Sequence, residues 1–171
     1  QFYGDRIAVP TGRIGWMTLM MLQAANATAA LLLREAGVAA GWSWLDRAWT
    51  RLLPLAAALA WAFVPAVLHV FDGAGPEGWA ATAVFLALIG GSLIMYIRHG
   101  PDFAAVALAT LAACLYACAL VVRVIVPENF WRLDYAPVFF VLLAVCIMAV
   151  FAGGVIFLRR IWHGRAIRAH G

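Results

Sequence analysis

The chain has 171 residues, of which 66% are hydrophobic and only 12% are charged, with a mean hydropathy of +0.93 and a formal net charge of +4. A soluble domain is closer to half apolar and a quarter charged, so this composition excludes an ordinary soluble protein. The polar segments are too short to form a further domain with a basic face, which excludes nucleic-acid binding and predicts a single transmembrane domain over residues 1–171.

Five apolar runs are close to the length of a transmembrane helix, which needs about 20 residues to cross roughly 30 Å of hydrocarbon. Their apolar character is continuous and not alternating, which excludes a transmembrane β-barrel. We therefore predict an all-α integral membrane protein, a bundle of about five transmembrane helices with a short cytoplasmic interfacial amphipathic helix. The predicted spans are residues 14–33, 52–70, 79–97, 103–126 and 136–158, and the predicted interfacial helix is 42–52.

The first predicted span carries two amide side chains in its middle. Gln23 and Asn26 are three residues apart and therefore lie on one face of a helix. Polar side chains within a span usually face protein or a cavity, because lipid offers no hydrogen-bond partner. We predict that both make buried polar contacts, either with another helix or with a solute or quinone. The chain begins with Gln1 and not with Met, so we leave open whether a segment precedes it.

The segment WSWLDRAWTRLLP, residues 42–54, combines tryptophans with charged residues. Its apolar residues recur at i, i+3, i+7 and i+10, which is typical of an amphipathic helix. We predict that this helix lies in the cytoplasmic interface, with Trp42, Trp44 and Trp49 at headgroup level and Arg47 and Arg51 toward lipid phosphate. The alternative interpretation is a docking surface for a partner protein.

Charged residues near the end of the fourth span and in the following segment, PENFWRLDY, predict a polar cluster at the outer face. The stem of Arg123 is long enough to carry its guanidinium to the outer headgroups. A hydrated turn is the alternative to a site for a small polar ligand. The predicted cluster comprises Arg123, Glu128, Arg132, Asp134 and Tyr135.

Two histidines, His69 and His99, lie near predicted spans. They end successive helices and so belong to opposite membrane faces, about 30 Å apart at about 1.5 Å per residue, too far for one haem. We therefore predict no haem within the chain alone and leave open a haem or quinone shared with another subunit. His69 joins the amide pair as a candidate polar contact. No phosphate loop, zinc motif or nucleophile turn appears, so we predict no catalytic or metal site.

Small residues suggest where helices approach closely. Two patches stand out, Gly90 with Gly91 and Ser92 in the third span, and Ala149 with Gly153 in the fifth. Three cysteines, Cys114, Cys118 and Cys146, are expected to be small core residues at helix contacts.

Arginines are distributed unequally between the two sides that the predicted spans define, eight on one side and four on the other. The positive-inside rule then places the N-terminus outside and the C-terminus in the cytoplasm of a bacterial inner membrane. We expect contacts with membrane lipids and with other membrane subunits, and a role as a non-catalytic subunit of a respiratory, photosynthetic or transport complex. Two alternatives stay open: the membrane sensor or anchor of a signalling protein, whose output domain would follow Gly171, and a small stand-alone transporter or intramembrane lipid enzyme.

Overall fold

The computed structural model describes residues 13–72, 75–98, 102–126 and 136–169. Within these residues there is no strand, and five α-helices are long and apolar enough to cross a membrane, which confirms the predicted all-α multi-pass bundle. The elements are α1 (Arg13–Ala39), the 3-10 turn η1 (Ser43–Leu45), α2 (Ala48–Asp72), α3 (Pro76–Arg98), α4 (Phe103–Ile125) and α5 (Ala136–Ala169).

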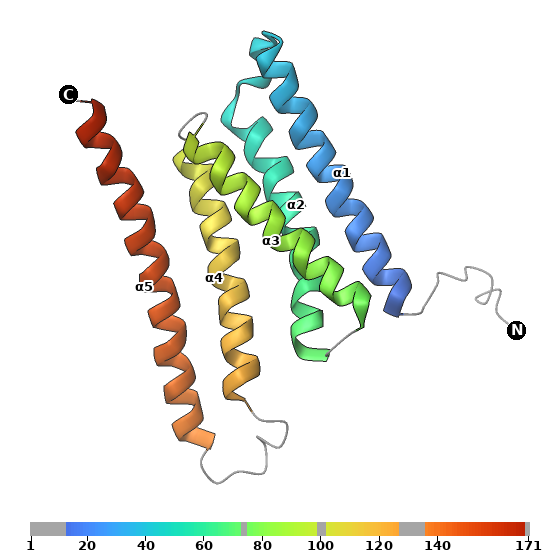
Figure 1. The fold of residues 1–171 in the computed structure, drawn as a ribbon, viewed down its shortest axis with the longest axis vertical. Helices are drawn as coiled ribbons and strands as arrows, with labels where there is room; N and C mark the ends of the chain where they lie inside the picture. Colours follow the sequence, from blue (N-terminus) through green and yellow to red (C-terminus); the bar gives the residue numbers. More distant parts are fainter. Residues whose placement is uncertain (1–12, 73–74, 99–101, 127–135, 170–171) are drawn as a thin grey trace, which may run out of the picture.

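The helices run alternately up and down, with α1 and α5 at opposite edges of the bundle (Figure 1). Helix α2 is central, because it packs against α1, α3 and α4, whereas α5 packs mainly against α4. This order brings the end of α1, the start of α2, the end of α3 and the start of α4 together at one end of the bundle (Figure 1).

The close helix contacts of α2 come from a row of alanines. Ala58, Ala62 and Ala66 are completely buried and recur every four residues, so they share one face. Small side chains of this kind let neighbouring helices approach closely. In the predicted patch of the third span Ser92 is buried, whereas a Cβ atom at Gly90 or Gly91 would have no neighbouring atom within 4 Å.

Helices α4 and α5 approach most closely at Gly154, where a Cβ atom would lie only 2.7 Å from Cys114 Sγ. The Cys114 thiol also donates a weak hydrogen bond to the Val150 carbonyl across a distance of 3.8 Å. Ala149 and Gly153, the predicted patch, are exposed on the other side of α5, so that patch makes no close helix contact among the described residues and stays a prediction for contacts with another chain. The expectation that Cys114 lies at a helix contact is confirmed.

Helix α1 ends in a Schellman motif at Gly41. The Trp42 amide donates to the Gly37 carbonyl and the Gly41 amide donates to the Val38 carbonyl, both across 3.0 Å. Gly41 adopts φ +89°, a left-handed conformation that glycine reaches without the steric cost of a side chain. The chain therefore reverses at this residue and returns toward α2.

The predicted separate helix over 42–52 is not present. A continuous helix would require the Leu45 carbonyl to accept a hydrogen bond from the amide four residues later. That carbonyl accepts instead from Thr50 Oγ1 at 2.6 Å and from Arg34 Nε at 3.0 Å. Thr50 Oγ1 also lies 2.7 Å from the carbonyl oxygen of Arg47, the residue just before α2. The segment is consequently divided into η1, a bend and the first residues of α2, which begins at Ala48.

Candidate functional site

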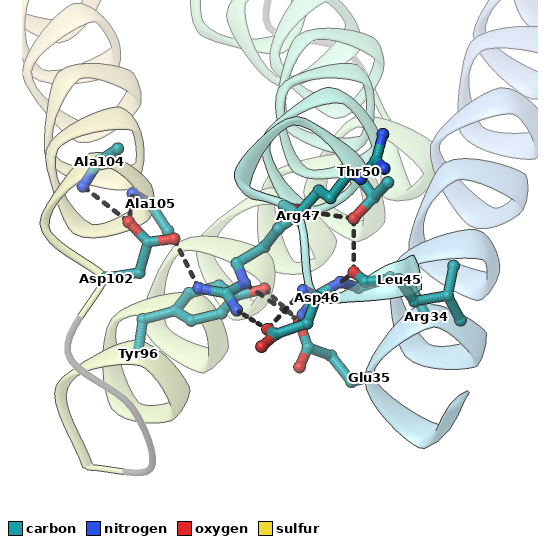
Figure 2. Close-up of polar contacts among 11 residues, drawn as sticks. Arg34, Glu35, Leu45, Asp46, Arg47, Thr50, Tyr96, Asp102, Ala104 and Ala105 are labelled. Carbon is teal, nitrogen blue, oxygen red and sulfur yellow. Dashed lines mark hydrogen bonds and ion pairs between the residues drawn. The ribbon is translucent and has the colours of Figure 1, made fainter. Parts of the chain in front are cut away.

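Five ionisable residues meet at the end of the bundle where four helix ends converge (Figure 2). Arg34 and Glu35 come from the end of α1, and Asp46 follows η1. Arg51 lies in the first turn of α2, and Asp102 precedes α4. Two guanidinium groups and three carboxylates form what we call the charged cluster. Its members are Arg34, Glu35, Asp46, Arg51 and Asp102.

Arg51 is the centre of the charged cluster. Its Nη1 donates to Asp102 Oδ2 at 2.6 Å, and its Nε and Nη2 lie 3.7 Å from Glu35 Oε1 and 3.6 Å from Asp46 Oδ1. The guanidinium carbon is 5.7 Å from the ring centre of Tyr96, a cation–π distance. The Tyr96 hydroxyl in turn donates to Glu35 Oε1 at 3.1 Å. One side chain thereby connects all of α1, α2, α3 and the start of α4.

Asp102 has a second function as the N-cap of α4. Its Oδ1 accepts hydrogen bonds from the amides of Ala104 and Ala105, at 2.9 and 3.3 Å (Figure 2). Burial raises the pKa of this carboxyl. The hydrogen bond from Arg51, those from the two amides and the Arg51 charge lower it by more than burial raises it, so the pKa lies below its ordinary value of 3.8. Asp102 is therefore ionised at neutral pH and stabilises both the helix start and Arg51.

Arg34 is the most deeply buried member of the charged cluster, with a side chain only 3% exposed. Its Nη1 donates to Glu35 Oε1 at 2.6 Å and its Nε to the Leu45 carbonyl. Its Nη2 lies 3.6 Å from Asp46 Oδ1, too far for a hydrogen bond, and has no hydrogen-bond partner in the described part of the chain. Removing a charge this deep from water costs free energy that the paired carboxylates and the Leu45 carbonyl offset.

The charged cluster thus acts as an electrostatic connection between helix ends. Each carboxylate lies within 4 Å of an arginine, so every acidic member of the charged cluster is paired with a positive charge. No group of three or more potential metal ligands occurs in the ranges that the structure describes. The arrangement fixes the helix ends relative to one another at one end of the bundle.

Arg51, predicted to point toward lipid phosphate, contributes instead to the charged cluster and is 20% exposed. Arg47 is exposed. Trp42, Trp44 and Trp49 are all more than half exposed, and the rings of Trp42 and Trp44 stack with centroids 6.4 Å apart. The role of these tryptophans as lipid anchors stays a prediction.

Gln23 and Asn26 lie on the exposed side of α1 and are not buried within the bundle. His69 is buried at the far end of α2 from the charged cluster, with its ring edge-on to Trp79 at a centroid distance of 4.7 Å. Its Nδ1 has no hydrogen-bond partner among the described residues. The structure therefore separates His69 from the two amides, which lie on a different helix.

Arg123 is exposed near the end of α4. The other predicted members of the outer-face cluster, Glu128, Arg132, Asp134 and Tyr135, lie outside the described residues, so that cluster stays a prediction.

Sequence reasoning missed Glu35, Tyr96 and Asp102 as partners of the arginines. A signal was present, because Glu35 and Asp102 flank predicted spans and Tyr96 lies in the last turn of another, all at ends that alternate to the same side of the membrane. Carboxylates on an arginine-rich side are candidates for pairing. Comparisons of this chain with protein families, curated proteins and solved structures found no match.

Proposed function

We propose that this chain is a non-catalytic multi-pass subunit of a larger membrane assembly, such as a respiratory, photosynthetic or transport complex. The observation that carries the proposal is the exposure of Gln23 and Asn26 on the outer side of α1. Both lie near the middle of the candidate span Gly15–Ala39.

The two amides point away from the rest of the bundle. The buried apolar residues of α1, Met17, Ala24 and Leu31, recur every seven residues on a different face of the helix. Neither amide has a hydrogen-bond partner in the described part of the chain. Hydrocarbon offers none, so a membrane helix of another subunit, presenting a hydrogen-bonding side chain or carbonyl, is the partner that fits this surface.

The position of α1 supports the same function. It is an edge helix, and one of its long sides is open (Figure 1). Helix α5, at the other edge, has no buried residue within its most apolar stretch in the described chain. The charged cluster meanwhile holds α1 against α2 through Arg34 and Arg51, so the amides are presented on a fixed surface.

Replacing Asn26 by leucine should weaken assembly without unfolding the chain. An interhelical hydrogen bond in a membrane contributes about 0.6 kcal/mol, so we expect recovery of partner subunits in mild detergent to fall about threefold. Thr28→Val is the matched control, because Thr28 Oγ1 already donates to the Ala24 carbonyl of its own helix at 2.7 Å. Purification of the wild-type chain as a lone monomer with transport or enzymatic activity would contradict the proposal.

We further propose that the protein lies in the cell inner membrane with the N-terminus outside and the C-terminus in the cytoplasm. The support is the arginine distribution, since Arg34, Arg51 and Arg98 lie at helix ends on the side where α5 also ends. Reporter fusions after Gly75 and after Gly171 test it. A cytoplasmic reporter should be active only after Gly171, and cytoplasmic activity after Gly75 would reverse the orientation.

A further inference from the structure

A groove of about 370 Å³ separates α4 from α5 near the end of the bundle that carries the charged cluster. Its exposed lining is apolar, so Arg159 contributes its hydrocarbon stem to the wall and not its charged group. The lining residues are Phe103 on α4 and Val155, Leu158, Arg159 and Trp162 on α5. A groove with these walls accepts a hydrocarbon chain.

The groove lies at the ends of two candidate spans. Phe103 is the first residue of α4, and Trp162 is the last residue of the candidate span Phe140–Trp162. Their rings meet edge-to-face with centroids 5.5 Å apart. Tryptophan and arginine together are typical of headgroup level, where an apolar stem or ring lies in hydrocarbon and the polar end reaches the interface.

The charge at this end of the bundle complements an anionic headgroup. Among the described residues six arginines and three carboxylates lie here, which leaves an excess of +3. The carboxylates are those of the charged cluster, and each is already paired with Arg34 or Arg51. The six arginines are Arg34, Arg47, Arg51, Arg98, Arg159 and Arg160.

We propose that the α4–α5 groove is a binding site for an anionic phospholipid, with one acyl chain against Val155, Leu158 and Trp162 and the phosphate beside Arg159. The acyl chain fills the apolar groove and the phosphate meets the positive charge at its boundary. This site is independent of the contact proposed for α1, which lies at the other edge of the bundle (Figure 1).

The test measures quenching of Trp162 fluorescence by brominated lipid. The protein is placed in nanodiscs of phosphatidylcholine and phosphatidylglycerol at one fixed composition, with brominated acyl chains on either lipid. Subtracting the spectrum of Trp162→Phe isolates the Trp162 signal from the other seven of the eight tryptophans. We expect phosphatidylglycerol to occupy the groove about fivefold more often than its mole fraction predicts, since one basic residue contributes about 1 kcal/mol of attraction.

Arg160→Gln is the matched control, because it removes the same charge from the next residue, which does not line the groove. Arg159→Gln should abolish the preference for phosphatidylglycerol, whereas Arg160→Gln and Arg159→Lys should keep it. Quenching that is equal for both brominated lipids would overturn the proposal. So would an equal loss in Arg159→Gln and Arg160→Gln, which indicates general surface attraction, or protection of Trp162 from both lipids, which indicates a protein occupant.

Discussion

Replacing Arg51 by methionine should lower the free energy of unfolding by about 3 kcal/mol, because it leaves the partly buried Asp102 carboxylate without its counter-ion. Asp102 loses its 2.6 Å hydrogen bond, and Glu35 and Asp46 lose a nearby positive charge. Tyr96 loses its cation–π contact as well. Thermal unfolding in detergent, followed by circular dichroism, measures the loss.

Arg47→Met is the control, because it removes an arginine that is exposed and belongs to no ion pair of the charged cluster. A second variant distinguishes lost charge pairing from lost packing. Asp102→Asn keeps a side chain that can cap α4 but removes the charge, so combining it with Arg51→Met should recover part of the stability. Equal destabilisation by Arg47→Met and Arg51→Met would show that the charged cluster contributes nothing specific.

The Arg51→Met variant should also change how the stability of the protein responds to acid. The folded-state pKa of Asp102 is lowered, so its contribution to stability is complete above its ordinary pKa of 3.8 and is lost as the pH falls through the lowered value. Without Arg51 the main cause of that lowering is absent, while burial still raises the pKa. Measured by thermal unfolding at a series of pH values, the stability difference between the wild type and Arg51→Met should therefore narrow as the pH falls below 3.8, because protonated Asp102 no longer needs a counter-ion.

Replacing Gly154 by leucine should push α5 away from α4. The first added carbon would already lie 2.7 Å from Cys114 Sγ and 3.5 Å from Thr110 Cγ2, so the larger side chain cannot fit without separating the helices. Overpacking of this kind costs about 1–3 kcal/mol. The effect on α5 should be large, because α4 is its main packing neighbour. Distances between spin labels at Leu111 and Met148, two exposed positions, would report the separation.

Gly153→Leu is the matched control, since a side chain at Gly153 meets no atom within 4 Å and should leave the label distance unchanged. The smaller change Gly154→Ala should be rescued by Cys114→Ala, which removes the sulfur that the new methyl group contacts. An unchanged label distance in Gly154→Leu would contradict the close packing of α4 on α5.

Local hydropathy was sufficient to predict the spans. An apolar run of sufficient length must be helical in lipid, because its backbone groups find no other partners, and this holds whatever the neighbouring helices are. The run at 103–126 is α4, Phe103–Ile125, almost to the residue. The run at 14–33 continues to Ala39 in α1, because Arg34 is paired with Glu35 and does not end the helix as a solvated charge.

The tertiary structure alone decided the orientation of individual side chains. Gly153 and Gly154 are adjacent in sequence, yet only Gly154 meets α4, because one residue turns a helix by about 100°. Arg51 had the spacing of a lipid-facing residue, but the start of α4 brings Asp102 within 2.6 Å of it. A guanidinium takes a carboxylate partner when one is in reach, and only the packing of α4 beside α2 places one there.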